Sequence, residues 1–572
     1  MLKKRLGVEG IEKDWLNYRR YTDHAYNLYK IPSTLIIPES CGRIGYWAFR
    51  YCAKLKKVVI PKSVEGIGEE AFYSCVRLEE VIIPEGCENI GGNAFNNTQW
   101  YNNQPNGLVY VGNVAYQYKG TMPQGTSITL KEGTKGITVG AFNGCTGMTS
   151  ISIPNTVINI GYGAFQTCKS LTSVVIPNKV EKIGEYTFSS CVSLSSVTIP
   201  DSVTSIGLRA FQNCSGLTSV VIPNSVQYLG ARAFGQCENL SSATIGNNVA
   251  NIYERTFYNC TSLTSITIPS SVSEIGEGAF YNCSSLSSLT IEDGVETISS
   301  RAFQYCSGLT SVTIPDSVQY IGELAFNRCS SLTSVTIGSG TTIIDKMAFQ
   351  TCNGLTTLTL NEGLEKIGYG AFSYSPSLSS VTIPNSVKEI EEGAFYDCSG
   401  LTSVTIGSGV TTWGDSVFWK DGNITTLTLE DGLTAIGKNA FKECTSLSNI
   451  TIPNSVTSLD YGAFHGCTSL TEITIPSGVT SIGEYVFNNC NSLLFVTTPS
   501  SVTSIREYAF RYCYSLSSIT IPSSVTSIAN NAFSNCRSLA TITINKAEGS
   551  ISGSPWGAST SSPTSTQIVW TG

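Results

Sequence analysis

The residues of this chain that could do chemistry are its cysteines and, in much smaller number, its histidines. The 572 residues include 20 cysteines but only two histidines. Thiols in this abundance could form disulfides, bind zinc or act as nucleophiles. Of the 20 cysteines, 18 follow a phenylalanine by three residues, as Cys214 follows Phe211. This fixed relation indicates that the cysteines belong to a structural pattern.

The spacing of the cysteines argues against a disulfide framework and against zinc. From Cys145 to Cys352 they recur once every 23 residues, close enough for neighbours to bridge. However, Cys398 stands between Ser375 and Asp421 in this series, and the next run has five members, so pairing cannot be complete. No CxxC pair suited to zinc is present. We expect the cysteines to be small, buried, hydrophobic side chains in the turn after phenylalanine.

Catalysis has little support in the sequence. His24 and His465 do not recur with the cysteine pattern, so one repeat cannot supply a Ser-His-Asp or Cys-His arrangement. A buried thiol also does not supply a thiolate nucleophile. We therefore predict that the chain is not an enzyme and has no catalytic residues, no bound metal and no cofactor.

The element that must position these residues is a repeat of 23 residues. Apart from one interval of 47 residues, the phenylalanines from Phe49 to Phe533 follow this spacing, and only Phe495 lies outside it. Residues 217–237 read LTSVVIPNSVQYLGARAFGQC, which gives the pattern L-x-x-V-x-I-P-x-x-V-x-x-I-G-x-x-A-F-x-x-C. A period of 20 to 29 residues with this apolar pattern is typical of a leucine-rich-repeat solenoid.

The pattern predicts how one coil is built. Its L-x-x-V-x-I segment alternates apolar and polar residues and ends at Pro or Gly, as a short β-strand does. The I-G-x-x-A-F-x-x-C segment has roughly helical spacing and predicts one helical or 3₁₀ turn. We expect a curved, elongated single body of about 22 coils with a parallel β-sheet.

The two ends of the chain depart from the repeat, which occupies residues 32–545. Residues 1–31 are rich in tyrosine and charge, and we expect an N-terminal cap, with attachment to a partner as the alternative. Residues 546–572 end in Ile-Val-Trp, which predicts a C-terminal cap strand, with Trp556 and Trp570 covering the last coil.

Composition limits the partners of the chain. Charged residues make up 13% and the net charge is −7, so the chain offers no field for nucleic acid phosphates. No apolar run approaches the roughly 18 residues that cross a bilayer. Acidic residues interrupt the first 15 positions, which do not read as a secretory signal. We expect no nucleic-acid binding and no membrane insertion.

The recurring sequence SVTIPDSVTSIG-x-x-AF-x-x-C resembles the BspA-type leucine-rich repeat family over about residues 32–545. The resemblance implies an adhesin at the cell surface or outside the cell, which binds a protein or glycan ligand on a host or neighbouring cell. It implies no catalytic residues. Such repeats are also encoded by bacteriophages, so the alternative is a structural or receptor-contacting component of a virion. Neither the ligand nor the oligomeric state follows from the resemblance.

The interval of 47 residues contains the first candidate contact site. Residues 96–126 replace one coil, and LVYV and VAYQY flank the turn dipeptide Gly112-Asn113, which predicts a β-hairpin. Its aromatic residues could pack on the solenoid or could protrude and contact a ligand. The candidate contacts in this insert are Trp100, Tyr101, Tyr110 and Tyr116.

The outward face of the strands contains the second candidate. Serine and threonine dominate its outward positions, which makes a polar and monotonous surface. Asn449, Glu472 and Phe495 interrupt it on three consecutive coils and form the most specific patch. Drift at exposed positions is the alternative explanation. In a further irregular coil, residues 411–423, Trp413 takes an isoleucine place and Asp421 a cysteine place, which we interpret as repeat decay with local swelling.

Overall fold

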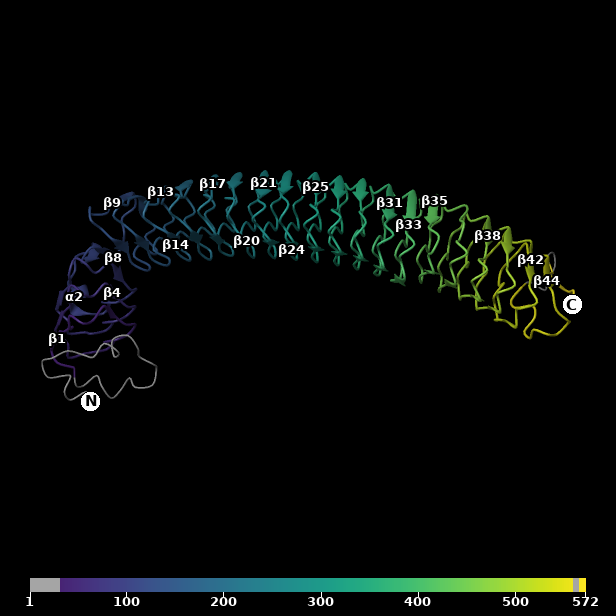
Figure 1. Cartoon of the computed structure of the whole chain (residues 1–572), viewed down its shortest axis with the longest axis horizontal. Helices are drawn as coiled ribbons and strands as arrows, with labels where there is room; N and C mark the ends of the chain where they lie inside the picture. Colours follow the sequence, from purple (N-terminus) through teal and green to yellow (C-terminus); the bar gives the residue numbers. More distant parts are fainter. Residues whose placement is uncertain (1–30, 559–564) are drawn as a thin grey trace. The chain divides into compact units, whose positions relative to one another are not determined.

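The computed structural model of the chain describes residues 31–558 and 565–572 (Figure 1). Contacts divide the chain into two compact units, Met1–Leu263 and Thr264–Gly572. Each unit is a stack of 23-residue turns made of short parallel strands, and the chain has about 23 such turns. The predicted leucine-rich-repeat solenoid is therefore confirmed. The cap or attachment role expected of residues 1–31 falls almost wholly outside the described residues.

Most coils contain two short strands where the sequence predicted one, although the coil of residues 447–452 has no front strand. The front strand is the V-x-I segment that follows leucine, and the back strand is the two-residue segment that ends at the isoleucine before glycine. The front strands of the first unit are β1 (Thr34–Ile36), β3 (Lys57–Val59), β5 (Glu80–Ile82), β9 (Thr126–Thr129), β11 (Met148–Ser152), β13 (Ser173–Val175), β15 (Ser196–Thr198), β17 (Ser219–Val221) and β19 (Ser242–Thr244). Its back strands are β2 (Arg43–Ile44), β4 (Gly66–Ile67), β6 (Asn89–Ile90), β10 (Gly136–Ile137), β12 (Asn159–Ile160), β14 (Lys182–Ile183), β16 (Ser205–Ile206), β18 (Tyr228–Leu229) and β20 (Asn251–Ile252).

The second unit repeats this arrangement. Its front strands are β21 (Ser265–Ile268), β23 (Ser288–Ile291), β25 (Ser311–Thr313), β27 (Ser334–Thr336), β29 (Thr357–Thr359), β31 (Ser380–Ile383), β33 (Ser403–Ile406), β35 (Thr426–Leu429), β38 (Glu472–Thr474), β40 (Phe495–Thr497), β42 (Ser518–Ile521), β44 (Thr541–Ile544) and β45 (Gln567–Trp570). Its back strands are β22 (Glu274–Ile275), β24 (Thr297–Ile298), β26 (Tyr320–Ile321), β28 (Ile343–Ile344), β30 (Lys366–Ile367), β32 (Glu389–Ile390), β34 (Thr412–Trp413), β36 (Ala435–Ile436), β37 (Ser458–Leu459), β39 (Ser481–Ile482), β41 (Ser504–Ile505) and β43 (Ser527–Ile528).

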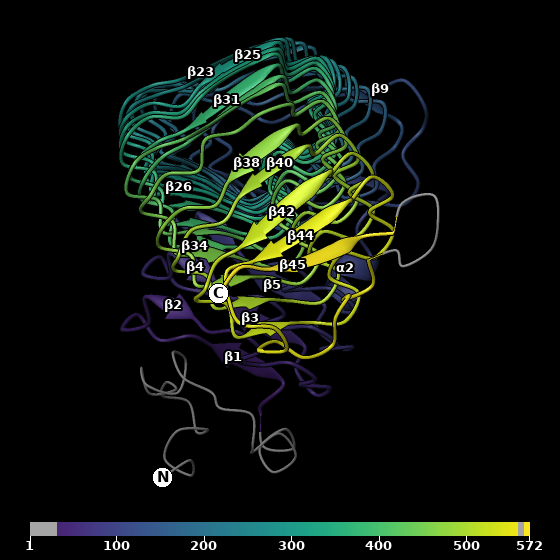
Figure 2. The same ribbon diagram turned by 90° about the vertical axis from the view of Figure 1, so that its right-hand side faces the viewer.

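The strands pair in parallel with equivalent residues side by side. Ser173 of β13 pairs with Ser196 of β15, a separation of one 23-residue period. At the end of the chain β42, β44 and β45 lie side by side, and β45 pairs in parallel with β44 (Figure 2). Trp556, which precedes this strand, is buried and its carbonyl accepts a hydrogen bond from the Phe533 N–H at 3.1 Å.

The turn around phenylalanine is not helical, so this detail of the prediction is wrong. Two residues in each regular turn, two places before and two places after phenylalanine, have left-handed backbone, as Arg209 (φ 53°) and Asn213 (φ 58°) do around Phe211. A left-handed residue interrupts a right-handed helix. It also turns the N–H of Phe211 toward the next coil, where it donates to Ala233 O at 2.8 Å. The apolar spacing that resembles a helix therefore comes from a chain of tight turns.

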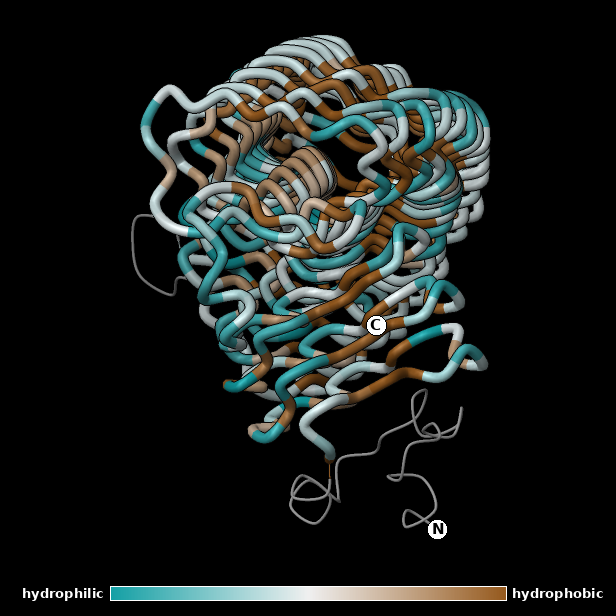
Figure 3. Tube along the Cα trace, turned by 90° about the vertical axis from the view of Figure 1, so that its left-hand side faces the viewer, coloured by the Kyte–Doolittle hydropathy of each residue, from teal (hydrophilic) through white to brown (hydrophobic). Residues whose placement is uncertain are grey.

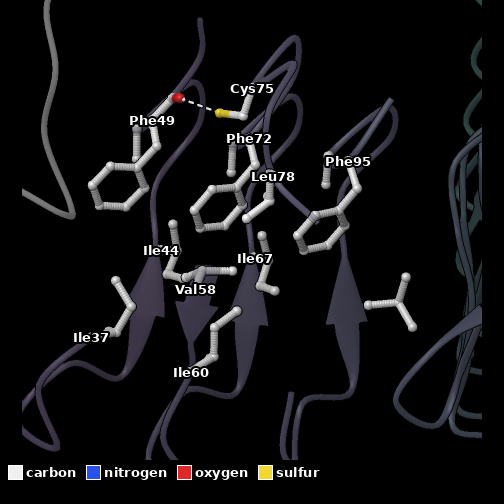
Figure 4. Packing of buried hydrophobic residues seen from close by; sticks show 14 of the residues in the cluster. Ile37, Ile44, Phe49, Val58, Ile60, Ile67, Phe72, Cys75, Leu78 and Phe95 are labelled. Atoms are coloured by element: carbon white, nitrogen blue, oxygen red, sulfur yellow. Dashed lines mark hydrogen bonds between the residues drawn. The ribbon is translucent and has the colours of Figure 1, made fainter. Parts of the chain in front are cut away.

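The core of each unit is a column of stacked phenylalanine rings, which in the first unit is interrupted by the insert between Phe95 and Phe142. Phe49, Phe72 and Phe95 are buried, and adjacent centroids are 5.2 and 5.3 Å apart with nearly parallel planes (Figure 4). Leucine, valine and isoleucine side chains from the strands complete the packing around them. Hydrophobic stretches recur at matching places in successive coils (Figure 3). The repeated sequence thus produces one core that extends along the stack.

We predict that truncating one ring of the column destabilises the protein strongly. Phe303 is fully buried between Phe280 and Phe326, at 5.2 and 5.1 Å. Phe303→Ala should lower the unfolding free energy by about 3–5 kcal/mol because it removes a buried ring and leaves a cavity. Phe495→Ala is the matched control, since Phe495 is 60% exposed. Its effect should stay within about 0.5 kcal/mol. Denaturant titration measures both, and equal losses would contradict the packing described.

Candidate functional site

The insert that replaces one coil is an antiparallel hairpin, as the sequence predicts. Strands β7 (Gly107–Val111) and β8 (Val114–Lys119) pair across Gly112-Asn113, and a short helix, α2 (Gln99–Asn102), precedes them. Strand β8 also pairs in parallel with β10. It therefore takes the place of the missing back strand, and the hairpin is built into the stack.

Tyr116 of this hairpin is a core residue, which corrects its assignment as a ligand contact. Its side chain is 1% exposed and packs edge-to-face on Phe95, with ring centroids 6.1 Å apart. In a regular coil the phenylalanine N–H donates to a carbonyl of the next coil. Here the next coil is missing, and the Phe95 N–H donates to the Tyr116 hydroxyl at 2.9 Å. That hydroxyl donates in turn to Asn96 Oδ1 at 2.7 Å. Tyr116 thus replaces both a ring and a carbonyl of the missing coil.

The other three aromatic candidates of the insert are partly exposed. Trp100 packs edge-to-face on Phe95 at 5.4 Å. The Tyr101 hydroxyl donates to Gln117 Oε1 at 3.0 Å. Tyr110 lies beside the Lys131 ammonium, 4.4 Å from the ring centroid. Each ring has a structural contact and an exposed part, so Trp100, Tyr101 and Tyr110 stay available to a ligand.

The insert also brings the coils on its two sides close together at the back strands. Asn159 Nδ2 donates to Asn89 Oδ1 at 2.8 Å, although these residues are 70 positions apart. Lys135 and Glu88, which lie on either side of the insert, form an ion pair at 3.8 Å. Three regular coils would separate the two asparagines by about 14 Å. The stack of the first unit therefore closes up at its back where the coil is missing.

The three residues of the front-face patch occupy equivalent places. Glu472 pairs with Phe495 in the parallel register of β38 and β40. The coil of Asn449 precedes them, because the Thr471 N–H donates to Ser448 O at 3.0 Å. Asn449 and Glu472 are exposed, and Phe495 is 60% exposed. The structure therefore brings together an amide, a carboxylate and an apolar ring on one surface.

Many hydroxyls of the repeat have a structural role that the sequence analysis missed. The residue after leucine donates to the carbonyl one coil earlier, as Ser195 does to Thr172 O at 3.0 Å. The serine before the buried valine does the same, as Ser202 does to Val180 O at 2.8 Å. These bonds recur in both units and form ladders between coils. The outward positions of the front strands, such as Ser219 and Thr244, remain exposed.

The cysteine column is buried, as predicted from its spacing. Cys237 Sγ donates to Phe211 O at 3.3 Å, and the same contact recurs along both units. Burial raises the pKa of the Cys237 thiol to about 12, and that of Cys467 likewise to about 12. A thiol held in this way is neutral at physiological pH and lacks the nucleophilicity of a thiolate. Sequence reasoning located these residues but not their hydrogen bonds.

Asp421 introduces a carboxyl group into the thiol column. It is fully buried, and its Oδ1 accepts a hydrogen bond from the Cys398 N–H at 2.7 Å. Its Oδ2 is buried without a partner. Burial raises the pKa of the Asp421 carboxyl well above its ordinary value. A protonated Oδ2 would supply a donor in the place where the other coils have a thiol. In the coil of Trp413 and Asp421 a carboxyl group therefore takes the place of the thiol, and the coil remains stacked on its neighbours.

A groove that the sequence analysis did not anticipate lies along the turns of the second unit. We call it the 328–397 groove; it has a volume of about 460 Å³. It occurs where Ser375 replaces the column cysteine and Pro376 follows, and this substitution was the available signal. The groove is lined by Arg328, Thr351, Asn353, Tyr374, Pro376, Asp397 and Ser399. A second groove of about 340 Å³ includes Asp460, Tyr461 and Arg506.

Comparison with known families identifies the chain. The model of the BspA type leucine rich repeat region matches residues 22–120, 112–241, 204–333, 321–448 and 434–556. The chain therefore belongs to the BspA-type leucine-rich repeat family. Proteins of this family are typically bacterial surface proteins. No curated protein sequence gives a significant match.

Three solved structures of bacterial leucine-rich repeat proteins are similar to this chain. A leucine-rich repeat protein from Bacteroides ovatus is 24% identical over 78% of this chain and 91% of its own, with a TM-score of 0.35. A leucine rich cell surface protein from Faecalibacterium prausnitzii is 24% identical over 70% and 88%, with a TM-score of 0.27. The leucine rich repeat protein of T. pallidum is 29% identical over 32% and 87%, with a TM-score of 0.28. All three TM-scores are below 0.5, so the family assignment rests on the repeat sequence.

Within residues 31–558 and 565–572, no helix has the length and hydrophobicity to span a bilayer. Over the same residues, no cluster of three or more histidine, cysteine or acidic side chains is arranged to hold a metal ion.

We predict that the hydroxyl of Tyr116 contributes to stability. Tyr116→Phe leaves the buried Phe95 N–H without its acceptor, which should lower the unfolding free energy by about 1–3 kcal/mol. Tyr110→Phe is the control, because the Tyr110 hydroxyl accepts its hydrogen bond from Lys131 N–H at an exposed position. Thermal or denaturant unfolding of the two variants measures the difference. Equal stability of Tyr116→Phe and the parent would contradict the role of this hydroxyl.

We predict that Asp421 makes stability depend on pH. Because its pKa is raised in the folded state from an ordinary 3.8, the folded chain holds this proton more tightly than the unfolded chain. Stability should therefore fall as pH rises above about 4. Cys398, Cys444 and Asp397 are the titratable neighbours, and the first two are buried thiols with raised pKa values.

The reference for this prediction is Asp421→Cys, which restores the column residue. The difference in unfolding free energy between this variant and the parent should grow in favour of the variant between about pH 4 and about pH 8. The introduced thiol is largely neutral below about pH 8, and the remaining titrating groups are common to both proteins. A difference that stays constant over this range would show that Asp421 is ionised in the folded protein.

Proposed function

We propose that this chain is a non-enzymatic binding scaffold, an adhesin of a bacterial surface that recognises a protein or glycan on a host or neighbouring cell. The proposal rests on one observation: the backbone groups are hydrogen-bonded within the stack, whereas large aromatic rings are exposed on its surface. The backbone groups bond from coil to coil, as the Phe211 N–H does, and so do many hydroxyls, such as those of Ser195 and Ser202. The large rings of Phe495 and Tyr374 are nevertheless 60% and 45% exposed. Exposed rings on a rigid scaffold are suited to recognition.

The chemistry of the reactive side chains supports binding over catalysis. The column thiols are buried, and burial raises the pKa of Cys237 and Cys352 to about 12, so these thiols are neutral. His465 is partly buried, and burial lowers its pKa below its ordinary value. Its ring nitrogen faces the Asn488 side chain at 3.2 Å. A neutral thiol and an amide-bound imidazole do not make a nucleophile and base pair.

Two surfaces are the proposed contacts. In the hairpin, Trp100, Tyr101 and Tyr110 keep exposed parts, whereas Tyr116 belongs to the core. On the front face, the patch of Asn449, Glu472 and Phe495 combines polar groups with a ring, and the last two residues lie on strands β38 and β40. Family membership supports a location at the cell surface, where such surfaces meet ligands.

The test is direct binding by the isolated chain. We expect the chain to bind members of an array of glycans and extracellular matrix proteins, and to bind cells that display them. Phe495→Ala or Tyr110→Ala should weaken binding at least about fivefold, as expected for contact rings. Val221→Ala is the control, because Val221 is an equally exposed front-strand residue, at 64%.

The location of the chain distinguishes a bacterial adhesin from a phage component. Antibodies against the chain should label the surface of the bacteria that produce it. Failure to bind any array member, together with recovery of the chain in purified virions, would overturn the proposal in favour of a phage component.

A further inference from the structure

We propose that the 328–397 groove binds an oligosaccharide that carries a carboxylate group. The inference rests on the proposed function and names a ligand class and a site for it. The groove lies in the second unit, at the corner where the phenylalanine turns lead into the front strands, between coils whose back strands β28, β30 and β32 are paired on both sides. Peptides are often bound by adding a strand to the open edge of a sheet. These back strands have no open edge, so a peptide could not bind them in this way.

The groove is a local departure from the repeat. In neighbouring coils a cysteine follows phenylalanine by three residues, whereas here Ser375 stands in that place, buried, with its hydroxyl lacking a hydrogen-bond partner. Pro376 follows and lines the groove. Arg328, Thr351 and Tyr374 occupy the same place in three consecutive coils. Because the threonine is much smaller than its two neighbours, it leaves a depression between them. The groove therefore depends on residues specific to this stretch.

One wall of the groove is an aromatic platform. Tyr374 is 45% exposed. Its ring packs edge-to-face against Tyr396 at 5.4 Å, and Tyr396 packs in the same way against Trp419 at 5.4 Å. The packing holds the Tyr374 ring in place without covering it. A rigid, partly exposed ring is suited to stacking against the apolar face of a sugar ring at small entropic cost.

The two ends of the groove carry opposite charges. Arg328 and Asp397 occupy the same place in coils that are three periods apart, which corresponds to about 14 Å along the stack. Within the described residues neither side chain takes part in an ion pair, whereas the nearby Lys346 and Lys388 pair with Glu323 and Glu365 at 3.2 and 2.7 Å. The Arg328 guanidinium lies over the Tyr305 ring, 5.7 Å from its centroid, which leaves its hydrogen-bond donors available to a ligand.

The chemistry of the lining fits an acidic sugar better than a peptide. A guanidinium group binds a carboxylate through two parallel hydrogen bonds, so Arg328 would hold the acidic group. The lining also offers the amide of Asn353 and the hydroxyls of Thr351 and Ser399, which can donate to and accept from sugar hydroxyls. The Asp397 carboxylate would accept hydrogen bonds from hydroxyls at the far end. The exposed Tyr374 ring beside these hydroxyl and amide groups matches the combination of an apolar face and hydroxyls that a sugar ring presents.

The test uses the full chain and paired ligands. The probes are oligosaccharides of uronic acids and the same oligosaccharides with each carboxylate reduced to an alcohol. We expect the parent chain to bind the acidic form more tightly than the reduced form by about tenfold or more, as for loss of a charge-assisted bidentate contact. Arg328→Met should remove this preference and leave binding of the reduced form unchanged.

Two further variants test the platform and the far end. Tyr374→Ala and Asp397→Asn should weaken binding of both forms. The control is Tyr512→Ala, because Tyr512 occupies the same place as Tyr374 six coils further along and lies outside the groove. Thermal unfolding checks that the variants are folded, since all three groove side chains are at the surface.

The outcomes separate this inference from the proposed function. Equal binding of acidic and reduced oligosaccharides, or groove variants that bind like the parent, would overturn the inference while adhesion to cells still supports the scaffold. Competition by a hexaglutamate peptide at concentrations similar to the acidic sugar, lost in Arg328→Met, would assign the groove to acidic peptides and would also overturn it. Absence of any binding by the parent chain to glycans, proteins and cells would overturn the proposed function itself.

Discussion

The structure depends on one contact between neighbouring coils, centred on the phenylalanine of each turn. The ring stacks on the next ring, while the peptide group of the same residue bonds to the next coil through its N–H and accepts a thiol through its carbonyl, as Phe211 does with Ala233 and Cys237. Hydrophobic packing and backbone hydrogen bonding therefore act at the same place. Left-handed residues on either side are tolerated because they direct these groups outward to the next coil.

Much of this stack could be predicted from the sequence because the same residues recur at one spacing. Equivalent residues 23 positions apart must pair in parallel, and the registers of β13 and β15 agree with this. The back strands were missed because two residues carry no alternation to recognise. The helical turn was wrong because tight turns can place Ile, Ala, Phe and Cys at nearly helical intervals. Nothing in the identity of Arg209 signals a left-handed backbone.

The candidate sites were harder to predict because their roles depend on contacts across coils. An aromatic residue in an insert reads as a possible contact, yet Tyr116 fills a vacancy in the ring column and supplies a missing acceptor. The hydroxyls of the repeat read as a display surface, yet many form ladders between coils, as Ser195 does. Conversely, the 328–397 groove arises where a serine and a proline interrupt the turn, a change that looks minor in the sequence.

The parallel register of the strands has a consequence for how proteins of this design can vary. Because the strands pair with equivalent residues one period apart, gain or loss of a whole regular coil preserves this register, whereas gain or loss of a single residue misaligns the turn. The distance between two surface sites in one unit can therefore change only in steps of one strand spacing, about 4.8 Å. Recombination between repeats would tune the reach between two contact points in fixed increments, without any redesign of the interior.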